Sequence, residues 1–374
     1  MRHVAICATR LMLMFAFLAA CTVPAEEAQG RSARYSPGLE AYNRGVDAIN
    51  KGDIDAAIAA YTEAIRLDPN LAVAHYNRGL AYQRQSHPDL AVKDYDEAIE
   101  SNSDDADAFA MRGLAYTDLG KLDHALEDLS QAIKLAPKAA ASYVNRANVY
   151  LHLGKDDLAL QDANQALQLD PSSADTYYNR GNIFLKKQDY DHALADFGQA
   201  IRLDPGMASA YNNRGLIYET RHDLDHAIQD FTQALAIQPN LATVLVNRSA
   251  AYTEKGANAQ ALADVEHALA ANPRDAMAYF DRGVLLSIAG NADRALSDYG
   301  QAIALNPKLS AAYNNRGVIY AARQDFVQAV KDYDMALNLD PSNANARTNR
   351  LLADQKKPGV ADNRALTHIE VAQR

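Results

Sequence analysis

An arginine recurs every 34 residues along this chain, followed at a fixed distance by an aspartate. The arginines are Arg44, Arg78, Arg112, Arg146, Arg180, Arg214, Arg248, Arg282 and Arg316. The aspartates are Asp94, Asp128, Asp162, Asp196, Asp230, Asp264, Asp298 and Asp332. Such columns can bind anionic ligands or form internal ion pairs, and we interpret them as ion pairs of the scaffold because the two series match. Ala60 replaces the first aspartate and Arg350 follows the last, which predicts forward pairing, Asp332 with Arg350 and Asp94 with Arg112.

Asparagine stands directly before most of these arginines, with Met111 and Asp281 as exceptions. Asparagine is a mediocre helix former, so its recurrence needs another reason. Its amide donates and accepts hydrogen bonds and so matches a peptide bond of an extended or helical ligand. The alternative is that the amides bond to a neighbouring repeat. We interpret the asparagine column as a ligand-binding surface, to which two neighbouring tyrosines add apolar contacts. The predicted protein-binding residues are Asn77, Asn145, Asn179, Asn213, Asn247, Asn315, Tyr76 and Tyr178.

The histidines form no convincing metal site. His124, His192 and His226 share one column, but successive repeats separate equivalent side chains by about 10–20 Å. That distance is too large for them to bind the same zinc ion. His222 and His226 alone would make a weak site. No nucleophile elbow, phosphate loop or H-E-x-x-H motif occurs. The sequence therefore predicts no metal, no cofactor and no enzymatic activity.

The first residues have the features of an export signal. Arg2 and Arg10 flank an apolar stretch that is too short to span a bilayer. It ends in "LAAC", which resembles the lipobox of bacterial lipoproteins and makes Cys21 the lipidation site. The alternative is cleavage after Ala25 and a soluble periplasmic or secreted protein. We expect a signal peptide at 1–20, a flexible tether at 21–37, and a location at the periplasmic face of the outer membrane.

The spacing of small residues identifies the elements that carry these side chains. In rows of 34 that begin at Gly38, the eighth position is usually glycine and the twentieth is always alanine. Proline occupies position 32 in eight of the nine rows. Apolar residues recur at three- and four-residue steps in two stretches of each row, which indicates two amphipathic helices. Neither helix of a pair can bury its apolar face alone, so the pairs must stack.

These positions resemble the tetratricopeptide repeat, whose signature has Leu-Gly, Tyr, Ala, Phe, Ala and Pro at this spacing. Two positions depart from it: arginine precedes the glycine, and tyrosine, phenylalanine or histidine replaces the early tryptophan. The resemblance implies an all-α, right-handed solenoid of nine repeats with a capping helix at 344–356 and a mobile tail at 357–374. The repeats are 38–71, 72–105, 106–139, 140–173, 174–207, 208–241, 242–275, 276–309 and 310–343.

The resemblance also implies a function. We expect a protein-binding scaffold or adaptor in the cell envelope that holds a partner segment in a concave, asparagine-lined groove, as the related O-linked N-acetylglucosamine transferase does. The alternatives are a chaperone or assembly factor for envelope or secreted complexes, or a regulatory subunit of a separate enzyme. A net charge of -10 without a basic run argues against nucleic acid. The expected partners are a protein or peptide and, through the lipid, a membrane.

Overall fold

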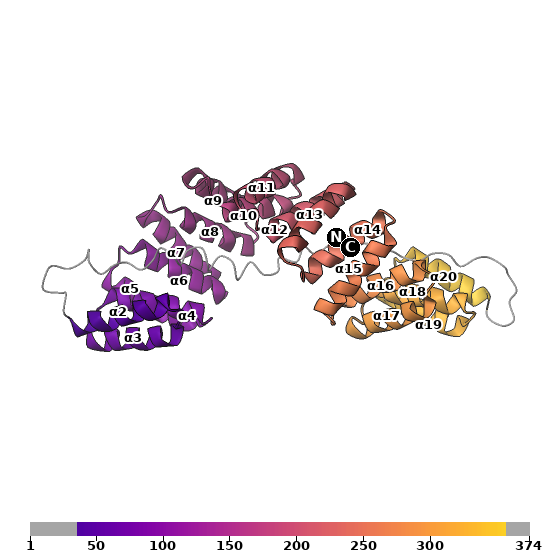
Figure 1. Cartoon of the computed structure of the whole chain (residues 1–374), viewed down its shortest axis with the longest axis horizontal. Coiled ribbons are helices and arrows are strands. Elements are labelled where there is room, and N and C mark those ends of the chain that lie inside the picture. Colours follow the sequence, from indigo (N-terminus) through magenta and orange to yellow (C-terminus); the bar gives the residue numbers. More distant parts are fainter. Residues whose placement is uncertain (1–35, 357–374) are drawn as a thin grey trace. The chain divides into compact units, whose positions relative to one another are not determined.

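The structure is a computed structural model that describes residues 36–356, and its regular structure in that range is entirely helical (Figure 1). The helices form pairs, one pair to each 34-residue row. The first helices are α2 (Pro37–Asn50), α4 (Ala72–Arg84), α6 (Ala106–Asp118), α8 (Ala140–His152), α10 (Ala174–Lys186), α12 (Ala208–Thr220), α14 (Ala242–Glu254), α16 (Ala276–Ile288) and α18 (Ser310–Ala322). The second helices are α3 (Ile54–Leu67), α5 (Pro88–Ser101), α7 (Leu122–Leu135), α9 (Asp156–Leu169), α11 (Tyr190–Leu203), α13 (Leu224–Ile237), α15 (Asn258–Ala271), α17 (Ala292–Leu305) and α19 (Phe326–Leu339). A final helix, α20, covers Ala344–Gln355.

The ends of the helices follow from local side-chain chemistry. Ser36 caps α2 by accepting a hydrogen bond from the Leu39 N–H, and Pro37 fits the first turn. Several second helices begin after an aspartate cap such as Asp189, which accepts from the His192 N–H. Between the paired helices the chain turns through a left-handed residue, for example Gly120 at φ 72°. The sequence therefore specifies each helix–turn–helix unit locally.

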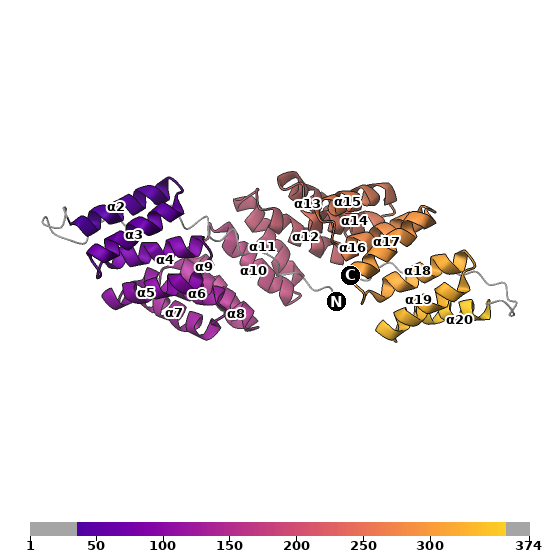
Figure 2. The ribbon, with the colours of Figure 1, turned by 90° about the horizontal axis from the view of Figure 1, so that it is seen from below.

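The chain divides into two compact units. The N-terminal unit contains α2–α11 and ends at Asp204, and the C-terminal unit contains α12–α20 and begins at Pro205. Within each unit every helix packs against the next along the chain, so neighbouring pairs stack side by side (Figure 2). Each unit is therefore a stack of helix–turn–helix repeats, and the predicted all-α solenoid class is confirmed.

The glycine at position 8 of a repeat allows the first helix to touch a large side chain at position 24 on the second helix. A Cβ placed on Gly181 would lie 2.8 Å from the Phe197 ring, and one on Gly45 would overlap the Tyr61 ring. Phe197 and Tyr61 are fully buried. The alanines at position 20, such as Ala193, are equally buried. These small residues mark close helix contact, as the sequence indicated.

Some predictions concern residues outside the described range. The signal peptide at 1–20, Cys21, nearly all of the tether at 21–37 and the tail at 357–374 lie there. Within 36–356, every helix is too short or too polar to cross a bilayer.

Candidate functional site

The arginine and aspartate columns form ion pairs inside each repeat. In the fifth repeat, Arg180 donates from Nε to Asp196 Oδ2 at 2.8 Å and from Nη2 to Oδ1 at 2.7 Å. The partners are always 16 residues apart and join the two helices of one pair. The pairs are Arg78–Asp94, Arg112–Asp128, Arg146–Asp162, Arg180–Asp196, Arg214–Asp230, Arg248–Asp264, Arg282–Asp298 and Arg316–Asp332. The interpretation as internal ion pairs is confirmed.

The predicted forward direction of this pairing is wrong. Arg350 binds Asp334 at 2.5 Å rather than Asp332, and Asp94 pairs with Arg78. Asp334 lies at position 25, two residues beyond the aspartate column. The two ends of the array were therefore misleading. Arg350 contacts the preceding repeat, and several arginines inside the array make this backward contact in addition to pairing with the aspartate of their own repeat.

The backward contact links consecutive repeats. A third guanidinium nitrogen, Nη1, donates to a polar side chain at position 25 of the preceding repeat. Arg112 reaches Asp96 at 2.7 Å and Arg180 reaches Asn164 at 2.8 Å. The same contact joins Arg78 to Thr62, Arg146 to Ser130 and Arg248 to Thr232. Each of these arginines thus ties three helices together.

The buried aspartates hold these arginines in their charged form. The hydrogen bonds that Arg112 donates to Asp128 raise the pKa of Arg112, outweighing burial, which would lower it. Tyrosine rings flank the guanidinium as well: that of Arg146 lies 5.8 Å from the ring centre of Tyr150. An anionic ligand would have to displace these partners, so the column is scaffold. Arg44 differs, because Ala60 stands in its aspartate position and its side chain is exposed.

Several of the asparagine amides bond across the junction between repeats. Asn77 donates from Nδ2 to the Tyr42 hydroxyl of the preceding repeat at 3.2 Å and to its own helix at Val73 O at 2.8 Å. Asn247 donates to Asn212 Oδ1 at 3.0 Å with the same 35-residue offset. In α20, Asn349 repeats this contact with Asn314 Oδ1 at 3.1 Å. These amides therefore help to set how one repeat sits on the next.

The predicted binding residues differ in accessibility. Asn77, Asn179 and Asn315 are buried, at 6%, 9% and 1% exposure. Asn315 is hydrogen-bonded to the hydroxyl of Tyr299, whose pKa burial raises to about 12. Asn145, Asn213 and Asn247 are half-buried and so retain some exposed surface.

The two predicted tyrosines pack on the second helices. Tyr76 is buried against Tyr95, with ring centres 5.8 Å apart, and Tyr178 is half-buried against Phe197 at the same distance. Both rings lie with the asparagines along the first helices, as the column predicted, but only Tyr178 offers appreciable surface.

Sequence reasoning missed the acceptors of two asparagine bonds. Asn212 and Asn314 stand at position 5 and accept from the asparagine of the next repeat. The signal was present in the doubled asparagine of "YNNRG" at Tyr211–Gly215 and Tyr313–Gly317. These are the rows in which position 5 is asparagine.

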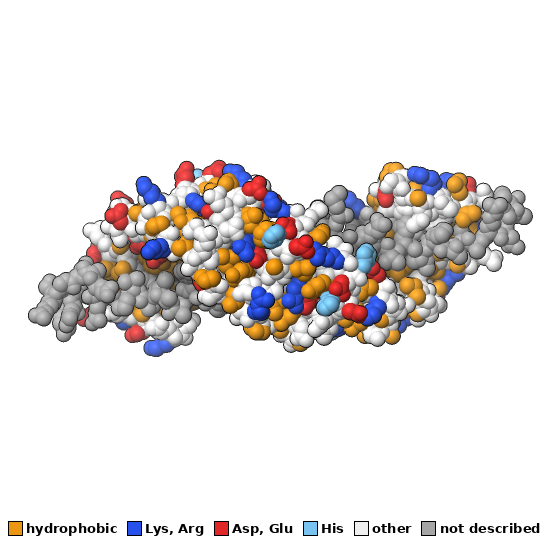
Figure 3. Space-filling view, turned by 90° about the horizontal axis from the view of Figure 1, so that it is seen from above, with side chains coloured by type: hydrophobic (Ala, Val, Ile, Leu, Met, Phe, Trp, Pro, Cys, Tyr) orange, Lys and Arg blue, Asp and Glu red, His pale blue; other side chains and the backbone are white. Residues whose placement is uncertain are grey.

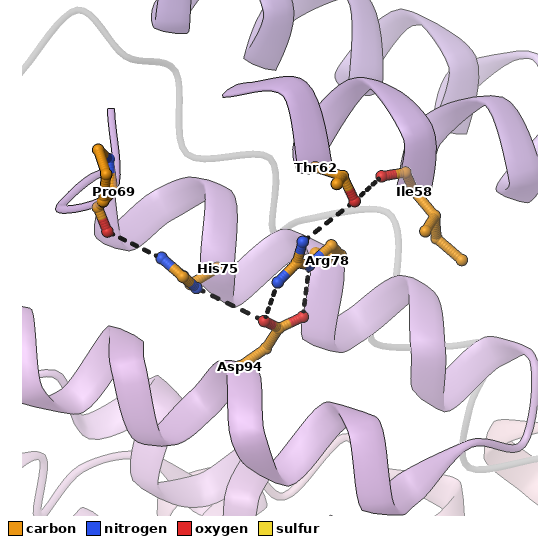
Figure 4. Close-up of polar contacts among 6 residues, drawn as sticks. All are labelled: Ile58, Thr62, Pro69, His75, Arg78 and Asp94. Atoms are coloured by element: carbon orange, nitrogen blue, oxygen red, sulfur yellow. Dashed lines mark hydrogen bonds and ion pairs between the residues drawn. The ribbon is translucent and has the colours of Figure 1, made fainter. Parts of the chain in front are cut away.

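His75 belongs to a second polar cluster that sequence reasoning missed (Figure 4). Its ring is buried, with Nε2 3.0 Å from Pro69 O and Nδ1 3.5 Å from Asp94 Oδ1. The contact with Asp94 is the main reason why the pKa of His75 is raised. The sequence pattern showed this histidine only as one of the replacements for the early tryptophan of the repeat signature.

The other histidines make local contacts. The rings of His124, His192 and His226 lie 4.9–5.1 Å from an aromatic ring of the same repeat, and His192 and His226 also bond to their helix-capping aspartates at 2.8 Å. No group of three metal-binding side chains occurs within residues 36–356.

The chain matches sequence models of a known repeat family. A model described as "TPR repeat" matches residues 49–86, 113–154 and 148–188. A second, described as "Tetratricopeptide repeat", matches residues 72–105, 174–207, 208–241 and 310–343. Together these segments span more than half of the chain. No match was found among curated proteins.

Solved structures of the same kind resemble this one. The Cut9–Hcn1 structure of the APC/C hetero-tetramer has a TM-score of 0.53 at 15% identity, covering 84% of this chain and 76% of that one. PilF of Pseudomonas aeruginosa has a TM-score of 0.50 at 20% identity, covering 59% and 96%. YrrB, described as a TPR protein with an unusual peptide-binding site, has a TM-score of 0.42 at 24% identity, covering 49% and 95%. At these identities the likeness concerns the fold.

Proposed function

From the premise that this chain is a tetratricopeptide-repeat protein, we propose that it is a scaffold that binds a protein partner in the cell envelope and catalyses no reaction itself. Such repeats serve as protein-interaction modules, and stacked repeats provide an extended surface for a partner. The described range from residue 36 to 356 consists of repeats and their final helix. Every segment of useful length is therefore engaged in building that surface.

We place the contact with the partner on the first helices, at the asparagines that keep exposed surface. Each unit offers a contact of its own, Asn145 in the N-terminal unit and Asn213 with Asn247 in the C-terminal unit. Asn247 uses one N–H for Asn212, which leaves its second N–H and part of its carbonyl oxygen for a ligand. The half-buried Leu216 adds apolar surface beside Asn213. A peptide main chain with small or apolar side chains fits this combination.

Charge on the visible surface supports a protein partner over nucleic acid. On the face in Figure 3, basic and acidic side chains are interspersed, and basic groups do not gather into a continuous stripe. The net charge of -10 would repel a phosphate backbone.

The scaffold proposal is tested by finding the partner and then removing the amides. A pull-down from solubilised membranes, followed by mass spectrometry, identifies the partner. The triple change Asn145→Ala, Asn213→Ala and Asn247→Ala then removes three amides, each contributing about 0.5–1.5 kcal/mol if it holds a peptide bond, so affinity should fall by about tenfold to a thousandfold. The matched control changes three exposed amides on second helices, Gln161→Ala, Gln229→Ala and Gln260→Ala. Equal affinity of the two triple variants would contradict ligand contact by the asparagines.

The membrane attachment is a separate part of the proposal and rests on "LAAC" after an apolar core. We propose that Cys21 carries a lipid and holds the protein at the periplasmic face of the outer membrane. Cys21→Ser should abolish incorporation of labelled fatty acid and move the protein to the soluble fraction. A wild-type protein that takes up no label and begins at Glu26 would instead be a soluble periplasmic or secreted protein.

A further inference from the structure

His75 occupies a position that is aromatic in most other repeats. The fourth position holds Phe109, Tyr143, Tyr177, Tyr211, Tyr279 and Tyr313 in those rows. Tyr143 donates its hydroxyl to Pro137 O at 3.2 Å, in the connection before its helix. His75 makes the equivalent contact with Pro69 O at 3.0 Å. Histidine therefore keeps the link to the preceding connection and adds a second nitrogen that tyrosine lacks.

That second nitrogen faces a carboxylate. Nδ1 lies 3.5 Å from Asp94 Oδ1, and the side chains of His75 and Asp94 are 7% and 4% exposed. A neutral imidazole has one N–H. When that N–H is on Nε2 and donates to Pro69 O, the Nδ1 lone pair points at Asp94. The imidazolium instead donates from Nε2 to the carbonyl and places its positive charge 3.5 Å from the carboxylate. Both contacts are therefore favourable only in the charged ring.

Two charged groups act on this ring. Asp94 comes from α5 and favours the imidazolium, whereas Arg78, from α4 itself, opposes it. Arg78 is neutralised in turn by its own bonds to Asp94 at 2.7 and 2.9 Å. From α3, the uncharged Thr62 hydroxyl accepts from Arg78 (Figure 4). Within residues 36–356, no other charged side chain contacts the ring, and the balance raises the pKa of His75.

We propose that His75 is a pH-dependent clasp at the junction of the first two repeats, closed by protonation. The closed clasp joins the connection between α3 and α4 to α5. The first repeat stacks on a single neighbour within the described range, and a terminal repeat of such an array opens more readily than an internal one. His75 and Asp94 both lie in the second repeat, so charging the ring tightens the hold of α4 and α5 on the connection at Pro69 that carries the first repeat.

The sign of the effect follows from the direction of the shift. The pKa of the ring is higher in the folded than in the unfolded state, where it is about 6.5. The extra stability is therefore fully present below that unfolded value and is lost as the pH rises through the folded pKa. Each unit by which the pKa is raised corresponds to about a tenfold change in the equilibrium of an opening that removes the ring from both Pro69 and Asp94, and to less where the contact with Asp94 is kept. The junction tightens in mild acid and loosens above neutrality.

The test uses the full chain between about pH 5 and 8.5, where ordinary carboxylates stay ionised. Amide hydrogen exchange of α2–α4, corrected for its intrinsic pH dependence, reports opening of the first repeat. In wild type we expect protection to rise about threefold or more from pH 8.5 to pH 5. His75→Tyr keeps the carbonyl contact seen at Tyr143 and removes the titration, so its protection should be constant. The matched control is His152→Tyr, at an exposed histidine of α8, which should retain the wild-type profile.

A ring titration followed by NMR makes the result independent of folding yield. Histidine-labelled wild type should show the His75 resonance, assigned by its loss in His75→Tyr, titrating above about pH 6.5, the value of an unperturbed imidazole. Parallel exchange profiles of wild type and His75→Tyr would overturn the clasp. A His75 ring that titrates at or below about pH 6.5 would overturn it as well.

Discussion

The two units differ in how regularly an arginine links one repeat to the next. In the N-terminal unit, each junction has an arginine that reaches back to position 25 of the preceding repeat, at Thr62, Asp96, Ser130 and Asn164. In the C-terminal unit, Arg248 and Arg350 make the same link, to Thr232 and Asp334. Gly300 occupies this position before Arg316, and polar links there join Asn315 to Tyr299 and Arg323 to Asp293. Asparagine pairs add a second link at the Arg248 and Arg350 junctions, Asn247–Asn212 and Asn349–Asn314. Repeats two to nine all have the internal Arg–Asp pair, whereas the link between repeats varies.

The largest expected loss of stability, from removing an aspartate of an Arg–Asp pair, is the same in the two units. Asp196→Ala leaves the guanidinium of Arg180, 22% exposed, without its buried partner and should lower the free energy of unfolding by about 3 kcal/mol. Asp264→Ala should cost a similar amount in the C-terminal unit, because Arg248 is paired in the same way. Chemical denaturation of both variants measures these losses. Adding Arg180→Ala to Asp196→Ala should recover part of the loss, whereas adding Arg214→Ala should not. Recovery with Arg214→Ala would contradict pairing within a repeat.

A second change tests the contact between glycine and the aromatic ring. In Gly181→Ala the new methyl group would lie 2.8 Å from the Phe197 ring, so the helix pair must separate, and we expect a loss of about 1–3 kcal/mol. Gly300 in α17 is the matched control, because no atom lies within 4 Å of its Cβ direction. Gly300→Ala should stabilise by about 0.5–1 kcal/mol through helix propensity. A pair of variants with the same sign of ΔΔG would contradict the role assigned to Gly181.

The asparagine links allow a sharper comparison. Asn349 is fully buried and donates to Asn314, so Asn349→Ala should cost about 1–2 kcal/mol by leaving a buried acceptor with fewer partners. Asn145 is half-buried, and Ala110 stands 35 residues before it, where the acceptor would be. Asn145→Ala should therefore change stability by less than about 0.5 kcal/mol. Thermal unfolding monitored by circular dichroism distinguishes them. A large loss in Asn145→Ala would place that amide in the scaffold.

The smallest expected effect concerns the arginine link. Asp96 is 49% exposed, and Asp96→Ala removes one of the two carboxylates that bind Arg112, at a cost of about 0.2–1 kcal/mol. The cost should shrink in 0.5 M salt, because exposed charges are screened. The loss in Asp128→Ala, whose carboxylate is buried, should depend less on salt. Denaturation curves at two salt concentrations test this ordering, and equal salt sensitivity would contradict it.

The repeat pattern predicted the fold because its period carries both helices and both turns. Gly181 and Ala193 mark where helices touch, and this depends on side-chain size alone, which the sequence shows directly. The sequence predicted that the arginine and aspartate columns form ion pairs, but it did not show whether each aspartate pairs with the arginine before it or with the one after it. Asp196 lies 16 residues after Arg180 and 18 before Arg214, and distance along the chain does not distinguish these partners. The answer depends on which helix faces which, a property of the packed pair.

The candidate site was harder to predict, because one residue type serves two purposes. Asn77 and Asn145 occupy the same position of their repeats, yet the first is buried and bonded to Tyr42, whereas the second is half-buried. The hydrogen-bond partner of Asn77 is the residue 35 positions earlier, and Ala110 stands at that distance before Asn145. That residue alone does not separate the two classes, because Asn213 follows Tyr178 at this distance and is half-buried. His75 required a contact with Asp94, 19 residues away, that periodicity does not indicate.

The fit of positions 8 and 24 restricts how such a chain can be cut and rejoined. Glycine meets a bulky residue in seven repeats, but Ala147 is matched with Ala163, and Ser249 with Val265. Recombination at a boundary between repeats keeps every match of positions 8 and 24. Recombination of the fourth and fifth repeats in the turn between their paired helices instead sets Ala147 against Phe197 or Gly181 against Ala163. The first hybrid is overfilled and the second contains a void. Duplication, deletion and the engineering of chimaeras should therefore succeed when whole repeats are exchanged, and the heritable module is the helix pair.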